Sequence, residues 1–277
     1  MVFDVKQDGR RKARLVARGN KTDPPSDAVH SGVASLRSLR IVAFLAELNG
    51  LKLTGGDIGN AYLEAYTKEK ICFRAGPEFG PHEGHLLIID KALYGLRTSG
   101  ARFHAKLADT LRSMGFTPTY GDPDVWIRDI GRCYEYVVVY VDDIFTGLED
   151  PKTFYDTLMS DPWNYKLKNV EEPRYHLGGD FFRDKDGTYC YGAQTYAKRL
   201  MENYKFLFGE PPREYHAPID KDYKPELDVS PLCGTGDIRK FQSLIGAVQW
   251  MISLCRSDVI RGACDLGLGL KRRTHVD

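Results

Sequence analysis

The sequence predicts an α+β protein built around a split βαββαβ sheet, and two observations support this. From residue 51 onward the predicted elements follow the order strand, helix, strand, strand, helix, strand, which is the order of the ferredoxin-like sheet. The strands are short apolar runs between turn residues, and the helices repeat apolar residues every three or four positions. Many unrelated functions share this sheet, so the fold class alone assigns no activity.

The first fifty residues predict a hairpin followed by one helix. Residues 2–6 and 12–18 alternate around the Asp-Gly pair at 8–9, which favours a β-hairpin with one basic strand. Ser35 is a suitable N-cap for the helix, and Gly50 is a suitable residue to end it.

The remaining elements are predicted from the same periodicities and from Pro and Gly punctuation. A linker rich in proline is expected over residues 209–236. Strands are expected at 51–57, 71–73, 85–89, 125–128, 134–141 and 144–146, a second hairpin at 175–183 and 188–191, and helices at 99–114, 151–158, 195–204 and 237–255.

Composition excludes several protein classes. The chain has 277 residues, of which 42% are hydrophobic and 28% charged, so a disordered chain is excluded. The longest apolar run, 136–141, is too short to cross a bilayer, and the first residues carry no export signal. Six scattered cysteines form no CxxC pair. We expect an intracellular protein that does not interact with membranes.

Charge is nearly balanced, with 39 basic and 38 acidic residues. The balance gives no simple sign of nucleic-acid binding. However, residues 10–21 are strongly basic and contain no acid. This stretch is either a solvated face or a phosphate-binding strand.

Three carboxylates are the sharpest chemical feature. Asp142 and Asp143 follow a strongly apolar strand, and Asp57 ends the first strand of the predicted sheet. An Asp-Asp pair is also common in ordinary turns. In a βαββαβ sheet, however, these two strands are central neighbours, so the three acids can converge. Such a set suits two magnesium ions, which prefer oxygen ligands.

Six sequence blocks occur in order along the chain. They are KARLVARG at 12–19, DI at 57–58 with AYL at 61–63, KALYGLR at 91–97 with Ser99, YVDDI at 140–144, YHLG at 175–178 and QSLIG at 242–246. Together they resemble the reverse transcriptase of copia-type (Pseudoviridae) LTR retrotransposons. The resemblance runs from about residue 2 to residue 270, and six blocks in order are far more specific than a single YVDD motif.

The resemblance implies the chemistry at the carboxylates. Asp57, Asp142 and Asp143 match the catalytic, metal-binding triad, which holds two Mg²⁺ ions, with Mn²⁺ as an alternative. One ion activates the 3′-hydroxyl of a primer, and the other steadies the leaving pyrophosphate.

The resemblance also implies a nucleotide-binding group. Tyr62 matches the aromatic residue that packs under the sugar and excludes a 2′-hydroxyl, although the residues alone favour a core aromatic. Lys12, Arg14 and Arg18 match the hairpin that holds the triphosphate. Alternation places Lys12 and Arg14 on one face, whereas Arg18 is expected either at the phosphates or in solvent.

The 91–99 block implies contacts to the nucleotide and the template. Tyr94 and Gly95 match nucleotide-binding positions, and Gly95 permits close backbone approach. Ser99 and Tyr140 are assigned to the template and primer, although Ser99 also suits a helix cap. Thr98 departs from the family, which usually has Gln at this position.

Two further departures and the primer-grip turn complete the assignment. Leu177 and Gly178 match the turn that positions the primer 3′ end, or form a plain hairpin. Gly100 stands where proline is frequent, and glycines at 55–56 replace bulkier residues. None of these changes removes a metal ligand.

The resemblance therefore implies a right-hand polymerase. The fingers are expected at 1–50 and 63–95, the palm at 51–62 and 96–185, and a partial helical thumb or connection region at 186–277. No RNase H is expected, because after Asp237 only three acids remain, Asp258, Asp265 and Asp277.

The expected activity is RNA-directed DNA polymerisation, a nucleotidyl transfer. Its partners are an RNA or DNA template with its primer and deoxynucleoside triphosphates, in the cytoplasm, within a retroelement particle, or in the nucleus. Two alternatives stay open: a catalytically silent nucleic-acid-binding relic, and a structural partner in a host assembly. The oligomeric state is left open.

Overall fold

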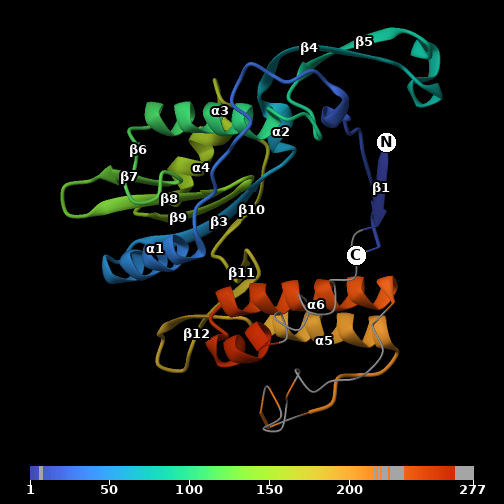
Figure 1. Cartoon of the computed structure of the whole chain (residues 1–277). Helices are drawn as coiled ribbons and strands as arrows, with labels where there is room; N and C mark the ends of the chain where they lie inside the picture. Colours follow the sequence, from blue (N-terminus) through green and yellow to red (C-terminus); the bar gives the residue numbers. More distant parts are fainter. Residues whose placement is uncertain (6–8, 215, 218, 220–223, 225–233, 266–277) are drawn as a thin grey trace. The chain divides into compact units, whose positions relative to one another are not determined.

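A six-stranded antiparallel sheet forms the centre of the first part of the chain (Figure 1). Its strand order is β10-β3-β9-β8-β7-β6. The four strands β10, β3, β9 and β8, with the helices between them, have the order of a βαββαβ sheet. The strands are β3 (Lys52–Ile58), β6 (Thr117–Pro118), β7 (Val125–Asp129), β8 (Tyr134–Tyr140), β9 (Asp143–Leu148) and β10 (Leu167–Glu171).

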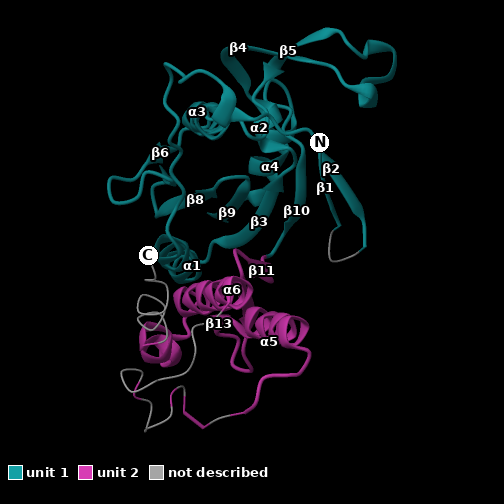
Figure 2. Cartoon of the chain, turned by 45° about the vertical axis from the view of Figure 1, so that its right-hand side comes forward, with its two compact units in different colours: residues 1–172 teal, residues 173–277 magenta. Residues whose placement is uncertain are grey.

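The computed structural model describes residues 1–5, 9–214, 216, 217, 219, 224 and 234–265. The chain divides into two compact units, residues 1–172 and 173–277 (Figure 2). The predicted 209–236 linker and Asp277 lie partly or wholly outside the described residues. Among the described residues, no helix combines the length and apolar character needed to cross a bilayer.

Two helices cover one face of the sheet. The helices α3 (Ser99–Ser113) and α4 (Pro151–Met159) contribute Phe103 and Tyr155 to a core that also contains Val137 of β8. Gly56 lies under α4, and a Cβ built on it would lie 3.0 Å from the ring of Tyr155. A side chain at position 56 would therefore crowd this ring, and glycine before Asp57 lets α4 pack closely on β3.

The other face is covered by α1 (Leu36–Leu48), which contacts β3, β8 and β9. As predicted, Ser35 caps this helix, because its Oγ accepts a hydrogen bond from the N–H of Ser38 at 3.1 Å. A Cβ on Gly147 would lie 2.7 Å from that of Ala46, so glycine allows α1 to approach β9 closely.

Two hairpins extend from this sheet. The first pairs β1 (Val2–Val5) with β2 (Arg11–Arg14), as predicted. The second pairs β4 (Tyr66–Arg74) with β5 (Leu86–Lys91). The short helix α2 (Ala61–Glu64) connects β3 to β4 and contacts α3.

The second unit contains a three-stranded antiparallel sheet and two long helices. Its strands are β11 (Tyr175–His176), β12 (Gly179–Arg183) and β13 (Tyr189–Gly192). The helices α5 (Gln194–Phe208) and α6 (Thr235–Ser253) contact each other. The mixed α+β class with antiparallel sheets is thus confirmed.

Candidate active site

The strand register brings Asp57 and Asp143 opposite each other. Asp57 near the end of β3 pairs directly with Asp143 at the start of β9. Side chains of directly paired residues stand on the same face of a sheet, with Cβ atoms about 5 Å apart. The convergence expected from the sheet order is therefore present in the backbone.

Asp142 reaches the same place through a tight turn. Tyr140 of β8 pairs with Asp143 of β9, so only Val141 and Asp142 form the loop. Val141 has a φ of 56°, which is rare for a β-branched residue and fits the first position of a type II′ turn. The N–H of Ile58 donates to the carbonyl of Asp142 at 2.8 Å, which ties the turn to β3.

The electrostatics of these carboxylates are unfavourable to the bare protein. Burial, reinforced by the charges of Asp142 and then Asp57, raises the pKa of Asp143 to about 6. Within the described residues, neither Asp142 nor Asp143 forms an ion pair with a basic side chain. An added cation would relieve this repulsion.

The donor set fits a hard cation, although the side chains do not form a closed ligand cage. Among the described residues, no group of three His, Cys, Asp or Glu is arranged as a ready metal site. The backbone of Asp57, Asp142 and Asp143 is held by the β3–β9 register and the turn. Their role as ligands stays a prediction.

A column of aromatic and cationic side chains lies beside the carboxylates. The ring of Tyr62 on α2 lies 4.9 Å from that of Tyr94 and 6.4 Å from that of Phe103. The Arg14 guanidinium lies over the Tyr94 ring, 5.1 Å from the ring centroid. This brings together three residues, from β2, α2 and the 92–98 loop, that the sequence assigned to nucleotide binding.

The hydroxyl of Tyr94 senses both the carboxylates and the hairpin. Burial raises its pKa, Arg14 opposes this shift, and the charge of Asp142 reinforces it, with smaller contributions from Tyr62 and Asp57. Tyr94 therefore lies within electrostatic range of the acids and of the basic hairpin. It links the two groups of predicted site residues.

The backbone around position 95 has room only for glycine. Its φ is 90°, and a Cβ there would overlap the carbonyl oxygen of Ala17. The N–H of Ala17 donates to the Tyr94 carbonyl at 2.7 Å, and the N–H of Gly19 donates to the Gly95 carbonyl at 3.1 Å. The close backbone approach predicted at Gly95 is thus made by the segment after β2.

Ser99 and Thr98 are buried in the first unit. The Ser99 hydroxyl donates to the Leu93 carbonyl at 2.7 Å, and the Thr98 hydroxyl donates to Glu69. Thr98, and not Ser99, occupies the N-cap of α3, and its side chain makes no capping bond. The Ser99 hydroxyl is therefore engaged in holding the Tyr94 loop, while contact with the template stays a prediction.

The other two hairpin cations are placed differently. Lys12 is half-buried on β2 and lies on the same face as Arg14, as alternation predicted. Arg18 is exposed and follows the hairpin. Triphosphate contacts by Lys12, Arg14 and Arg18 stay predictions.

Leu177 and Gly178 form a two-residue turn in the second unit. Both have positive φ, 48° and 90°, which fits the type I′ turn of a tight hairpin. A Cβ on Gly178 would lie 2.9 Å from Nε1 of Trp250, so the turn packs closely against α6. Its role at a primer stays a prediction.

Lys168 is a neighbour of the site that the sequence did not single out. It pairs with Asp57 from the outer side, on β10. No strand was predicted at 167–171, because this edge strand is mostly exposed and has no apolar alternation. Lys168 can be recognised as a neighbour of Asp57 only when the position of β10 beside β3 is known.

Comparisons with known proteins identify the family of this chain. A family model described as reverse transcriptase (RNA-dependent DNA polymerase) matches residues 1–211. The retrovirus-related Pol polyprotein from transposon RE1 of Arabidopsis thaliana is 26% identical over 254 residues, covering 90% of this chain and 17% of the relative.

Two other relatives give a similar picture. The Pol polyprotein from transposon TNT 1-94 of Nicotiana tabacum is 24% identical over 93% of this chain and 20% of its own length. The Ty1-LR2 Gag-Pol polyprotein of Saccharomyces cerevisiae is 31% identical over 94% of this chain and 15% of its own length. The chain thus spans a fifth or less of each of these relatives. Since the family model covers most of its residues, the chain belongs to the reverse transcriptase family, as its resemblance to the copia-type enzymes predicted.

Proposed function

We propose that this chain is an RNA-directed DNA polymerase module that adds deoxynucleotides to the 3′ end of a primer. The observation that carries the proposal is the pairing of Asp57 with Asp143, with Asp142 in the adjoining turn, in a chain of this family. In this proposal the central sheet belongs to a palm at 51–62 and 96–185. Residues 1–50 and 63–95 serve as fingers, and 186–277 as a thumb or connection region.

Asp57, Asp142 and Asp143 are the residues that would hold Mg²⁺, or Mn²⁺ in its place. Bound there, two such ions would supply charge stabilisation for the attacking 3′-oxygen and the leaving pyrophosphate. The raised pKa of Asp143 supports a cation at this place, because burial and two neighbouring acids disfavour its charge in the bare protein. The chain's part is to hold the three acids at one edge.

The aromatic column supplies the wall of the proposed nucleotide site. Tyr62 contacts the rings of both Tyr94 and Phe103, and these contacts limit the freedom of its ring to turn aside. A fixed ring under the sugar would exclude a 2′-hydroxyl by contact. Arg14 on the face of Tyr94 would place a cation where the triphosphate enters.

Primer extension tests this proposal. Purified protein is expected to extend a DNA primer on an RNA template with Mg²⁺ and deoxynucleotides. Asp142→Asn should reduce extension by at least about 100-fold, while binding of primer and template stays within about twofold, since binding comes mainly from phosphate contacts. Asp156→Asn, on the exposed side of α4, is the matched control and should extend normally.

The outcomes separate the alternatives. Extension by Asp142→Asn above about 1% of the wild-type rate would overturn the assignment of the acids. Binding without extension by the wild-type protein would favour a silent nucleic-acid-binding relic. Neither binding nor extension would favour a structural partner in a host assembly.

A further inference from the structure

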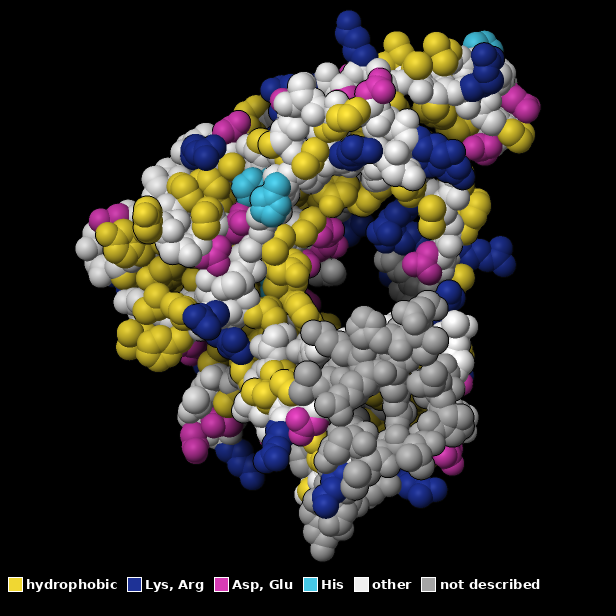
Figure 3. Space-filling model, viewed as in Figure 1, with side chains coloured by type: hydrophobic (Ala, Val, Ile, Leu, Met, Phe, Trp, Pro, Cys, Tyr) yellow, Lys and Arg dark blue, Asp and Glu magenta, His cyan; other side chains and the backbone are white. Residues whose placement is uncertain are grey.

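The outward face of α1 carries a row of exposed apolar side chains. Ile41, Phe44 and Leu48 are 50%, 65% and 68% exposed. The opposite side of the same helix, which includes Leu39 and Val42, is buried on the central sheet. Figure 3 shows hydrophobic side chains gathered over α1, with Lys or Arg side chains beside them. A surface helix normally has polar residues on its outward face, so this second apolar row needs an explanation.

The row has the spacing of a seam between two helices. Arg37, Ile41, Phe44 and Leu48 follow one another at steps of four, three and four residues. This is the heptad spacing at which two helices pack side by side along their length. Arg37 is also exposed, and its aliphatic stem can extend the apolar row by one turn while the guanidinium stays in water. The exposed row therefore fits a second helix.

The charges beside the row make α1 complementary to itself in the antiparallel orientation. Arg37 and Arg40 lie in the first half of the helix, and Glu47 lies in the second half. In an antiparallel pair related by a twofold axis, Ile41 faces the partner's Phe44, and Arg40 flanks the partner's Glu47. Arg37 then lies near the C-terminal end of the partner helix, which carries partial negative charge. A parallel pair would bring the two basic halves together.

The order of these charges favours a second copy of the chain over an unrelated helix. An acidic helix would attract Arg37 and Arg40 but would be repelled by Glu47, and a basic helix would meet the reverse. A second copy of α1 brings an acid to the place where the first has an arginine, and an arginine to the place where the first has an acid. Its charges therefore match on both sides of the twofold axis.

We propose that α1 mediates a dimer of this chain, in which two copies of the helix pack antiparallel along the row from Arg37 to Leu48. Arg40 and Glu47 also take part in interactions within their own chain, and the pairing across the seam adds to these. One helix from each copy makes a small interface, so the dimer forms at micromolar concentration and dissociates on dilution. The inference is independent of the proposed function, because no nucleic acid, nucleotide or metal takes part.

Sedimentation velocity of the full chain at increasing concentration tests the proposal. The wild-type protein should shift from monomer to dimer as its concentration passes through the micromolar range. Phe44→Glu should weaken the dimer by at least about 100-fold, because it would bury two carboxylates in the seam. Phe206→Glu is the matched control, since Phe206 is 85% exposed on α5. This control should dimerise like the wild type.

Charge reversal tests the orientation of the two helices. Arg40→Glu brings an acid to the partner's Glu47, and Glu47→Arg brings a cation to the partner's Arg40, so each variant alone should dimerise at least about tenfold more weakly. An equal mixture of the two variants should restore the affinity to within about threefold of the wild type, because opposite charges meet again at both contacts. Circular dichroism checks the fold of each variant, and Ile41→Glu replaces Phe44→Glu if that variant is unfolded.

Three results would overturn the proposal. The first is a wild-type chain that stays monomeric at about 100 µM, well above a micromolar Kd. If Phe44→Glu then lowers the thermal stability of that monomer, the row is covered by a segment of the same chain. The second is a dimer that Phe44→Glu leaves intact. The third is a mixture of folded Arg40→Glu and Glu47→Arg chains that remains monomeric although the wild type dimerises.

Discussion

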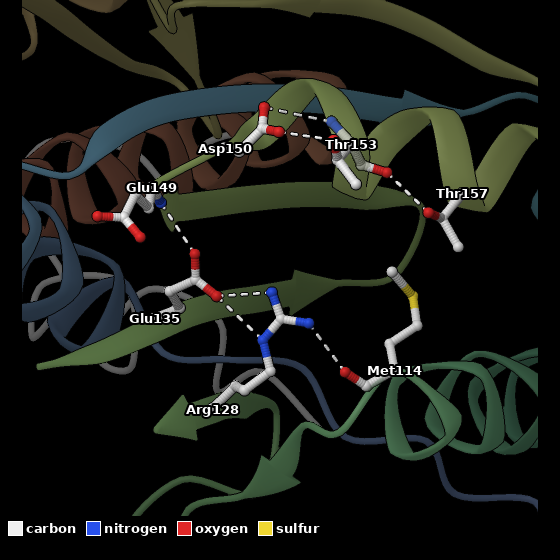
Figure 4. A network of polar contacts seen from close by, with 7 residues as sticks. All are labelled: Met114, Arg128, Glu135, Glu149, Asp150, Thr153 and Thr157. Atoms are coloured by element: carbon white, nitrogen blue, oxygen red, sulfur yellow. Dashed lines mark hydrogen bonds and ion pairs between the residues drawn. The ribbon is translucent and has the colours of Figure 1, made fainter. Parts of the chain in front are cut away.

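The β8–β9 hairpin carries acidic residues at both of its ends, and the two ends differ in how the negative charge is compensated by neighbouring groups. Away from the tight turn, Glu135 is 4% exposed. Its Oε2 accepts hydrogen bonds from Nε and Nη2 of Arg128 at 3.0 and 2.6 Å, and its Oε1 accepts from the N–H of Glu149 at 2.9 Å (Figure 4). At the turn, Asp142 and Asp143 have no such counterion among the described residues, and the pKa of Asp143 is raised to about 6.

Arg128 completes the network at the Glu135 end. Its Nη1 donates to the Met114 carbonyl at 2.9 Å (Figure 4). Its guanidinium also lies 4.5 Å from the centroid of the Phe116 ring. A buried acid with all its partners locks the hairpin to the end of α3. A cluster of like charges costs stability and is retained where a ligand supplies the missing charge. The difference supports the proposal that the turn is the functional end.

The largest effect on stability is expected at the Glu135 end. Arg128→Gln leaves Glu135 buried without its cation and should lower the free energy of unfolding by about 3 kcal/mol. Chemical denaturation measures this loss. Arg132→Gln is the control, because its ion pair with Glu149 is about half exposed and should be worth at most about 1 kcal/mol. Equal losses in the two variants would show that Glu135 is not the anchor described here.

At the turn end, the expected effect is on selectivity. Tyr62→Ala removes the ring that Tyr94 and Phe103 hold in place, and should raise ribonucleotide incorporation relative to deoxyribonucleotide by roughly tenfold. Single-nucleotide extension with each substrate measures this ratio. Tyr120→Ala changes a fully exposed ring and should leave the ratio unchanged. An unaltered ratio in Tyr62→Ala would make Tyr62 a core residue and not a gate.

His176 in the second unit shows the effect of burial on a basic side chain, which is to lower its pKa. Burial lowers the pKa of His176 to about 4, so the folded protein keeps this histidine neutral. Since the unfolded chain binds a proton near pH 6.5, stability is fully present above that pH and falls as the pH decreases toward 4. The second unit should lose roughly 1 kcal/mol between pH 7.5 and pH 5.5.

Denaturation of wild type and His176→Gln at the two pH values checks this expectation. The variant should lose less stability on acidification, whatever its stability at pH 7.5. An equal loss in both proteins would assign the acid sensitivity to other groups.

The smallest effect is expected from neutralising the turn. Asp142→Asn should change the free energy of unfolding by no more than about 0.5 kcal/mol, because it removes repulsion from Asp143 and breaks no ion pair among the described residues. Thermal unfolding without divalent ions measures this. A loss comparable to that of Arg128→Gln would erase the difference between the two ends.

Elements with strong local signals could be predicted from the sequence. The helix after Ser35, the helix opened by Pro151 and the helix ended before Gly115 have caps or breakers and periodic apolar residues, and all three are present. The edge strand β10 was missed, since its residues are mostly exposed and follow no alternation. The four-residue helix α2 is too short to show a period.

The site divides in the same way. The pairing of Asp57 with Asp143 could be predicted, because the order of strands in the sheet makes their strands neighbours. The contact of Gly95 with Ala17 could not, because both lie in irregular backbone and no periodicity connects distant loops. The fully bonded Glu135 was also not predicted, since its partners Arg128 and Glu149 come from two separate segments.

The backbone tie between residues 17–19 and the Tyr94 loop has a consequence for shortened versions of this protein. Three hydrogen bonds hold the segment after the basic hairpin. Two are donated by the backbone N–H groups of Ala17 and Gly19, and the third runs from Nε of Arg97 to the Gly19 carbonyl at 2.7 Å. A variant that starts after Gly19 would lose all three and leave the carbonyls of Tyr94 and Gly95 to water. Tyr94 would then lose the backbone hydrogen bond that holds its loop in place. Residues 17–19 therefore stabilise the Tyr94 loop, and removing them should disturb it.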